Sequence, residues 1–282
     1  MIPSLEAPRP VLGSVLLGAF LLFLFAPLLV VAVFAFNDAG YPAPPWRGFV
    51  LDWFVGNAAR GRVGLLQDDA LLGSIATSSV VALWVAVLSV TLGTAAAWLL
   101  ERMHFAGKSL LAALLLVPLV IPGVILGVSL LSLASGIAQL ADERWGLDLD
   151  FLRPGLPLVV CGQVSFMAAI ATLTIAARLK RLDPGLEEAA RDLGAGPWTG
   201  FRTIVLPYLR PTLVASAVVA FLMSFENFNT TLLLSGSDPP LTVFLYGRMR
   251  EGATPVVNAV SLLLMLASAL AAVLTRRRSP RP

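Results

Sequence analysis

One carboxylate lies in a long apolar run of the sequence, with polar and aromatic residues around it. The run from Pro211 to Ser237 is uncharged except for Glu226, and the same stretch contains Asn227, Asn229, Thr230, Phe221, Phe225 and Phe228. In a helix, Asn229 and Thr230 would share the face of Glu226. A carboxylate with amide, hydroxyl and aromatic neighbours suits an organic ammonium ion, through charge pairing and cation–π attraction. We therefore expect a translocation pathway lined by Glu226, Asn227, Asn229 and Thr230. The alternative is a structural role, in which Glu226 pairs with an Arg of another subunit or lies protonated between helices.

A second group of residues marks the most polar stretch of the chain, residues 178–210. Asp183-Pro184 is typical of a helix start, because Asp can cap the helix and Pro fits its first turn. We expect a short helix from Gly185 to Leu193, which Gly194-Ala195-Gly196-Pro197 would end. A second helix would run from Trp198 to Val205, before a turn at Leu206-Pro207. Two short helices meeting at a bend could transmit force, whereas a flexible loop would absorb it.

Several kinds of chemistry are excluded by what the sequence lacks. A single cysteine, Cys161, and a single histidine, His104, exclude an internal disulfide and a metal site built from Cys or His clusters. No segment matches the P-loop pattern G-x4-G-K-[ST], so ATP hydrolysis has to come from another polypeptide. We expect no catalytic residue, no metal and no cofactor on this chain. A membrane-embedded enzyme is disfavoured, because no nucleophile–base set appears.

The composition is that of an integral membrane protein. Apolar residues make up 57% of the 282 residues and charged residues only 13%, whereas soluble domains average about 25% charged residues. Too few charges remain to cover a soluble surface. A soluble enzyme, a nucleic-acid-binding module and a disordered chain are therefore excluded.

Six apolar runs are long enough to cross a bilayer core of roughly 30 Å as helices. We expect an all-α membrane protein with spans at about 11–36, 71–100, 109–135, 155–177, 211–235 and 254–275. Prolines at 118 and 122 predict a kink in the third run, with a hinge as the alternative. Gln163 and Ser165 in the fourth run could line the pathway or hydrogen-bond between helices. Trp46, Trp53 and Trp145 suit a membrane–water interface.

The distribution of Lys and Arg predicts the orientation, because inner loops are enriched in positive residues. With an inner N-terminus, most of these residues fall in inner segments, above all in residues 178–210 and in Arg276-Arg277-Arg278. We therefore expect both termini on the cytoplasmic side.

The polar stretch also carries a recognisable motif. Glu188-Ala189-Ala190, Gly194 and Ile204-Val205-Leu206-Pro207 match EAA-x3-G-x9-I-x-L-P and resemble the signature of bacterial ABC-importer permeases. The resemblance implies a type I importer-like fold and a single permease domain over residues 1–282. It also implies that residues 178–210 form a coupling loop that docks on an ATPase. The coupling residues would be Glu187, Glu188, Ala189, Ala190, Gly194, Ala195, Ile204, Leu206 and Pro207.

Further stretches are similar to the spermidine/putrescine permeases, in particular to the second of their paired membrane subunits. These stretches are Pro118–Gly127, Phe221–Gly236, Thr254–Ala259 and Pro45–Phe49. Permeases for ferric iron, thiamine and phosphonates share much of this skeleton, so a small solute of another class is an alternative. An ion-coupled secondary transporter working through Glu226 is the less favoured one. The chain departs from the family pattern at Glu226-Asn227, where many relatives have an Asp-Asp pair.

The resemblance also implies the partners and the location of the chain. It would pair with a homologous second permease subunit, two copies of an ABC ATPase and an extracytoplasmic solute-binding protein. ATP and Mg would be used by the ATPase. The chain would lie in the lipid bilayer of the bacterial inner membrane and would bind no nucleic acid.

Overall fold

The computed structural model describes the backbone of residues 10–252 and 254–278, and the side chains of residues 13–252 and 254–270. Within these ranges the chain is helical, with two isolated β-bridges and no strand. The chain forms two compact units, which we describe separately. The terminal unit contains residues 1–69 and 248–273, and the central unit contains residues 70–247 and 274–282. The two termini, expected on the cytoplasmic side, lie outside the described residues.

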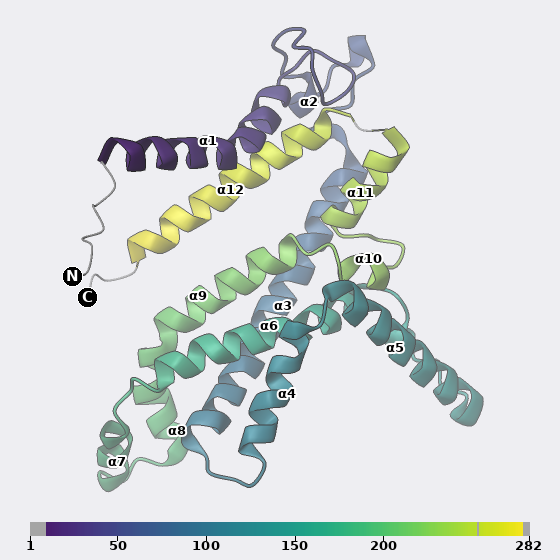
Figure 1. The fold of residues 1–282 in the computed structure, drawn as a ribbon. Coiled ribbons are helices and arrows are strands. Elements are labelled where there is room, and N and C mark those ends of the chain that lie inside the picture. The colour runs from purple at the N-terminus through teal and green to yellow at the C-terminus, as the bar shows by residue number, and fades with distance from the viewer. Residues whose placement is uncertain (1–9, 253, 279–282) are drawn as a thin grey trace, which may run out of the picture. The chain divides into compact units, whose positions relative to one another are not determined.

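The helices follow the apolar runs (Figure 1). The long ones are α1 (Pro10–Phe34), α3 (Asp69–Arg102), α5 (Gly123–Trp145), α6 (Leu156–Leu179), α9 (Leu206–Phe225) and α12 (Val256–Arg278). The shorter α-helices are α2 (Asp52–Val55), α4 (Lys108–Val120), α7 (Pro184–Asp192), α8 (Pro197–Gly200), α10 (Thr231–Leu234) and α11 (Leu241–Gly252). Three 3-10 turns, η1 (Ala58–Arg60), η2 (Leu65–Gln67) and η3 (Asp150–Leu152), and a π-helical segment, η4 (Phe201–Val205), complete the described elements.

Five helical stretches are long and apolar enough to cross a membrane. They are Gly13–Phe34, Asp69–Arg102, Gly123–Trp145, Leu156–Leu179 and Pro197–Phe225, and two shorter apolar helices cover Lys108–Val120 and Val256–Leu270. These helices account for all six expected runs, but the runs at 109–135 and 211–235 are interrupted. The segment between the expected runs 211–235 and 254–275 contains helix α11, which at 12 residues is too short to cross the bilayer.

The third expected span is broken into two helices rather than kinked. Helix α4 ends at Val120 and α5 begins at Gly123, because Ile121 and Pro122 have extended backbone (ψ 126° and 134°). Pro122 causes this break, since proline has no N–H to donate and drives the residue before it out of the helical region. Pro118, in contrast, is accommodated inside α4.

The core of the central unit is built around α6, which lies alongside α9 (Figure 1). Helix α3 also comes very close to α6. A Cβ atom added at Gly93 would lie 2.7 Å from Ala171 Cβ and 2.9 Å from the backbone nitrogen of Thr172. Only glycine permits this approach of the two helices. Leu179 and Leu209, almost completely buried, extend the same apolar core towards the ends of α6 and α9.

In the terminal unit, the loop after α1 is organised around the buried side chain of Asn37. The amide of Asn37 donates to Pro45 O (3.1 Å), and its oxygen accepts the N–H of Arg47 (2.7 Å). The indole of Trp53 donates to Asn37 O at 2.8 Å. Trp53 is only 5% exposed, so its role as an interface anchor was predicted wrongly: the indole belongs to the interior of this loop.

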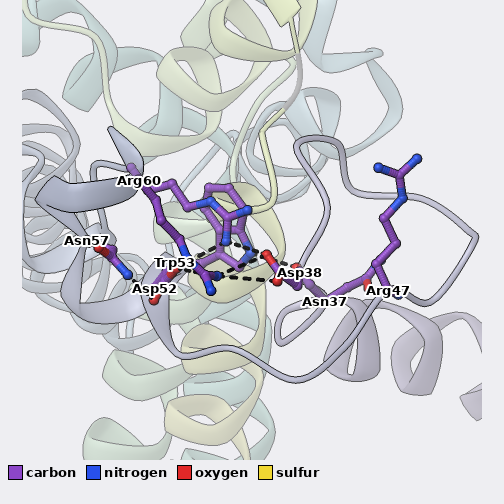
Figure 2. A network of polar contacts seen from close by, with 8 residues as sticks. Asn37, Asp38, Arg47, Asp52, Trp53, Asn57 and Arg60 are labelled. Atoms are coloured by element: carbon purple, nitrogen blue, oxygen red, sulfur yellow. Dashed lines mark hydrogen bonds and ion pairs between the residues drawn. The ribbon is translucent and has the colours of Figure 1, made fainter.

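Four charged residues close the same loop into an ion-pair cluster (Figure 2). Arg62 Nη1 lies 2.6 Å from Asp38 and 3.1 Å from Asp52, and its guanidinium stacks 4.7 Å from the Trp53 ring centroid. Arg60 adds contacts of 3.3 and 3.4 Å to the two carboxylates. The hydrogen bond from Arg62, assisted by both positive charges, lowers the pKa of Asp38 below its ordinary value.

Candidate functional site

Helix α7 in the loop 178–210 forms where the sequence predicts it, because both of its ends are specified locally. Asp183 Oδ1 accepts the N–H of Gly185 at 2.9 Å and caps the N-terminus. Gly194 follows the helix with φ +85°, a conformation that glycine adopts without strain. The N–H of Ala195 then donates to Ala190 O at 2.9 Å, which satisfies a carbonyl at the helix end.

Most of α7 faces away from the rest of the central unit. Glu188 and Ala189 are exposed, and Ala190 is half-buried. Leu186 and Leu193, at 52% and 89% exposure, were not identified from the sequence, although apolar residues flanking the motif in a polar loop were a usable signal. We call Leu186, Glu188, Ala189 and Leu193 the loop surface. Its mixture of apolar side chains and one carboxylate suits contact with another protein.

Glu187 does not belong to this exposed surface. Its Oε1 accepts a hydrogen bond from Arg102 Nε at 2.7 Å, and the two side chains are only 12% and 15% exposed. Arg102 is the last residue of α3 and was not identified as a site residue from the sequence. The geometry therefore separates Glu187, which points inward, from Glu188, which points outward.

The second half of the loop differs from the expected short helix and turn. The chain runs as one helical stretch from Pro197 to Phe225, with π-helical winding over Phe201–Val205. No turn is found at Leu206-Pro207, because the wider winding before Pro207 accommodates a residue that has no N–H. Ile204 packs against the buried cluster around Leu209, whereas Leu206 and Pro207 are exposed.

The expected membrane run 211–235 is interrupted at Glu226. Helix α9 ends at Phe225, and Glu226 is its C-terminal cap. The prediction that Glu226 shares a continuous helical face with Asn229 and Thr230 is therefore wrong. Glu226 and Asn229 are exposed in the single chain, whereas Asn227 is half-buried and Thr230 is 1% exposed.

A polar network holds the chain in this broken shape. Gln163 Nε2 on α6 donates to Thr231 Oγ1 at 2.8 Å, and Ser224 Oγ donates to Gln163 Oε1. Thr231 Oγ1 donates in turn to Asn227 Oδ1 at 3.1 Å, and Thr242 Oγ1 donates to Asn227 O at 2.9 Å. Gln163 is 1% exposed, so of its two possible roles the interhelical hydrogen bond is the one observed.

Small residues bring the two broken spans together. A Cβ added at Gly123 would lie 3.0 Å from Thr230 Oγ1 and 3.3 Å from Asn229 Cβ, and one added at Gly127 would lie 3.3 Å from Thr230 O. The break between α9 and α10 therefore packs directly against the break between α4 and α5. Thr230 is a packing residue here, and the exposed polar groups of the predicted pathway are Glu226 and Asn229.

The electrostatics of the break favour a cation. The C-terminal end of a helix carries roughly half a negative charge from its unpaired carbonyls, and the Glu226 carboxyl group lies at this end. Phe221 and Phe225 stack nearby at a centroid distance of 6.0 Å, but Phe228 packs against Tyr246 at 5.0 Å. The three Phe residues expected as neighbours of Glu226 thus belong to two separate aromatic pairs. Among the described residues, no group of His, Cys, Asp or Glu could hold a metal ion.

Comparisons with known proteins agree with a transport role. Residues 89–281 match the family described as "Binding-protein-dependent transport system inner membrane component". The putrescine transport system permease protein PotI of Escherichia coli K12 is 32% identical over 245 residues, which cover 86% of this chain and 82% of PotI. The spermidine/putrescine transport system permease protein PotC of the same strain is 27% identical, with 91% of each chain covered.

A solved structure shares the fold. A bacterial ABC transporter involved in the import of the acidic polysaccharide alginate aligns with a TM-score of 0.74 over 96% of each chain, at 19% identity. The expected all-α, importer-permease fold is therefore confirmed.

Proposed function

Because the chain belongs to the family of binding-protein-dependent transport system inner membrane components, we propose that it is the permease subunit of a polyamine importer. The chain is a multi-pass inner-membrane permease subunit of an ABC importer. The proposal concerns its substrate, its partners and the residues that serve them. Putrescine and spermidine are the proposed substrates.

The observation that carries the polyamine assignment is the Glu226 carboxylate at the interrupted end of α9. A dicationic substrate passing this point would meet the carboxylate, the negative end of the helix and the nearby Phe221–Phe225 pair. A charged residue at membrane depth is expensive, and such residues usually serve a pathway. The substrates named for PotI and PotC support the same class. Asn229 is the second pathway residue, and Asn227 and Thr230 support the break from within.

The proposed partners follow from what this chain lacks and what it exposes. The sequence has no P-loop, so a separate ATPase would bind and hydrolyse ATP with Mg. We assign the loop 178–210 to ATPase coupling, with Glu188, Ala189 and the rest of the loop surface in contact. Gly194 and Ala195 shape the bend, Ile204 lies in the π-helical segment that follows it, and Leu206 and Pro207 begin α9. The importer would be completed by a homologous second permease, a second ATPase copy and an extracytoplasmic binding protein. Residues 1–282 would form one permease domain, and residues 178–210 would lie on the cytoplasmic side.

ATPase stimulation in the reconstituted importer tests this assignment. The binding protein would be presented with putrescine, spermidine, ferric ion, thiamine or 2-aminoethylphosphonate in turn. The proposal predicts stimulation by a polyamine alone. Stimulation only by another of these ligands would contradict the polyamine assignment and assign a different solute. Uptake without any ATPase would instead support an ion-coupled secondary transporter.

A further inference from the structure

We propose that Arg102 is a positioning residue that fixes α7 to the transmembrane helices, so that movement of α7 is transmitted along α3. The inference deepens the proposed function, because it takes α7 as the helix that docks on the ATPase. It explains how the helix that contacts the ATPase stays attached to the transmembrane helices.

Helix α7 has few other attachments. It is nine residues long and has no buried residue, and helices this short are marginal on their own in water. Among side-chain hydrogen bonds between described residues, the bond from Arg102 to Glu187 alone joins α7 to a position far away in the sequence, 85 residues apart. Without this bond, α7 would be held mainly by its chain ends.

The guanidinium of Arg102 joins three elements at once. Its Nε donates to Glu187 Oε1 at 2.7 Å, and its Nη2 lies 3.3 Å from the carbonyl oxygens of Leu179 and Leu182. Leu179 is the last residue of α6, so the positive charge also lies at a negatively polarised helix end. The fixed fork of an arginine can make these contacts together, whereas a lysine offers a single nitrogen.

Helix α3 connects this clamp to the polar network at the broken helix. The hydroxyl of Ser78 on α3 accepts the N–H of Leu241 at 2.7 Å, and the next residue, Thr242, bonds to Asn227 O. Ser78 and Arg102 are separated along the helix by about 36 Å. A displacement of α7 applied to Arg102 would therefore reach the backbone next to Glu226 through one continuous helix.

Charge reversal tests this positioning role. Arg102→Glu or Glu187→Arg would place like charges in contact, whereas the double reversal restores an ion pair. We expect each single variant to lower the number of substrate molecules imported per ATP hydrolysed about tenfold, an effect within the coupling energies measured for contacting residues. The double reversal should recover part of the loss, because Glu at position 102 cannot donate to the two carbonyl oxygens.

The assay uses the whole reconstituted importer and measures uptake and ATP hydrolysis together. Co-purification of the ATPase reports assembly, and Arg144→Glu, at an exposed position outside the loop 178–210, is the matched control for the charge change. An unchanged ratio of uptake to hydrolysis in assembled Arg102→Glu importer would overturn the proposal. So would a double reversal as poorly coupled as the singles.

Conservative variants keep the test decisive if a charge reversal prevents folding. Arg102→Lys and Glu187→Gln preserve size and should still reduce coupling several-fold, and full coupling in both would count against the positioning role. The ratio is measured with whichever solute the wild-type importer transports. Failure of the wild type to import polyamines would therefore contradict the proposed substrate while leaving the role of Arg102 open to measurement with the true substrate.

Discussion

The side-chain amide of Gln163 on α6 donates a hydrogen bond to the Thr231 hydroxyl on α10 at 2.8 Å, across the point where the fifth membrane run is broken. The bond is buried, and Ser224 at the end of α9 shares the same amide through its oxygen. One glutamine thus fixes both sides of the interruption. Glu226 is held at a helix end as a consequence, rather than on a continuous helical face.

Removing this amide should loosen the break. Gln163→Leu would leave the Thr231 and Ser224 hydroxyls without their buried partner, which destabilises by about 1–3 kcal/mol. The thermal unfolding midpoint in detergent should fall by several degrees. Ser165→Ala is the control on the same helix, because among the described residues the hydrogen bond of Ser165 stays within its own turn, to Gly162 O. Equal midpoints for the two variants would contradict the role given to Gln163.

The close approach of α3 and α6 predicts a strong effect of a single methyl group. Gly93→Ala would bring a Cβ within 2.9 Å of a backbone nitrogen on α6, and overpacking of this kind costs about 1–3 kcal/mol. Gly73→Ala on the same helix meets nothing within 4 Å and should be neutral or stabilising, because alanine favours helices. Thermal unfolding of the two variants compares them directly. A Gly93→Ala midpoint as high as that of Gly73→Ala would show that the helices do not meet there.

Two glycines in the loop 178–210 allow the effect of backbone conformation to be tested apart from the effect of an added side chain. A Cβ would meet nothing within 4 Å at Gly194 or at Gly196, but Gly194 has φ +85° and Gly196 has φ −67°. Gly194→Ala should therefore strain the bend by about 1–2 kcal/mol and lower uptake per ATP hydrolysed, while Gly196→Ala should leave the bend intact. The ratio of uptake to hydrolysis in the reconstituted importer measures this difference. Identical coupling in both variants would refute the requirement for a left-handed residue.

The ion-pair cluster after α1 predicts a pH dependence at its own site. The pKa of Asp38 is lowered below its ordinary value of 3.8, chiefly by the hydrogen bond from Arg62. A lowered folded-state pKa gives stability that is complete above 3.8 and is lost as the pH falls below it. Thermal unfolding followed by Trp53 fluorescence, with the other tryptophans replaced by Phe, should show this loss on acidification. Asp38→Asn should lack that component, and a wild-type profile that is flat below this pH would contradict it.

The sequence predicts helix α7 well and the broken helix at Glu226 poorly, for a physical reason. The caps of α7 at Asp183 and Gly194 are local, so the residues that specify them lie within the segment itself. The end of α9 depends on Gln163, which lies 61 residues from Ser224 and 68 from Thr231. Hydropathy alone predicts a continuous helix over 211–235, because it contains no information on hydrogen bonds between residues far apart in the sequence.

The same dependence on distant residues explains why the sequence did not distinguish Glu187 from Glu188 in the loop 178–210. Both were expected to contact the ATPase, since they are adjacent in a polar motif. Only the position of Arg102, which comes from the packing of α3 beside α6, distinguishes Glu187 from Glu188. Pro122 differs, because its effect is local and was visible in the sequence. The sequence predicted a kink at this position, whereas the helix is broken into α4 and α5.

The most direct test of the account is ATP-dependent uptake of labelled putrescine into proteoliposomes that contain the complete importer. We predict that the wild type takes up putrescine. In Glu226→Gln the uptake rate should fall about tenfold or more, because the loss of one charge contact costs roughly 1.5–3 kcal/mol. Asp238→Asn, an exposed carboxylate beyond the broken helix, is the control and should transport normally, and ATPase co-purification should be unchanged in all three. Wild-type importer that excludes putrescine, or Glu226→Gln importer that transports it at the wild-type rate, would contradict the account.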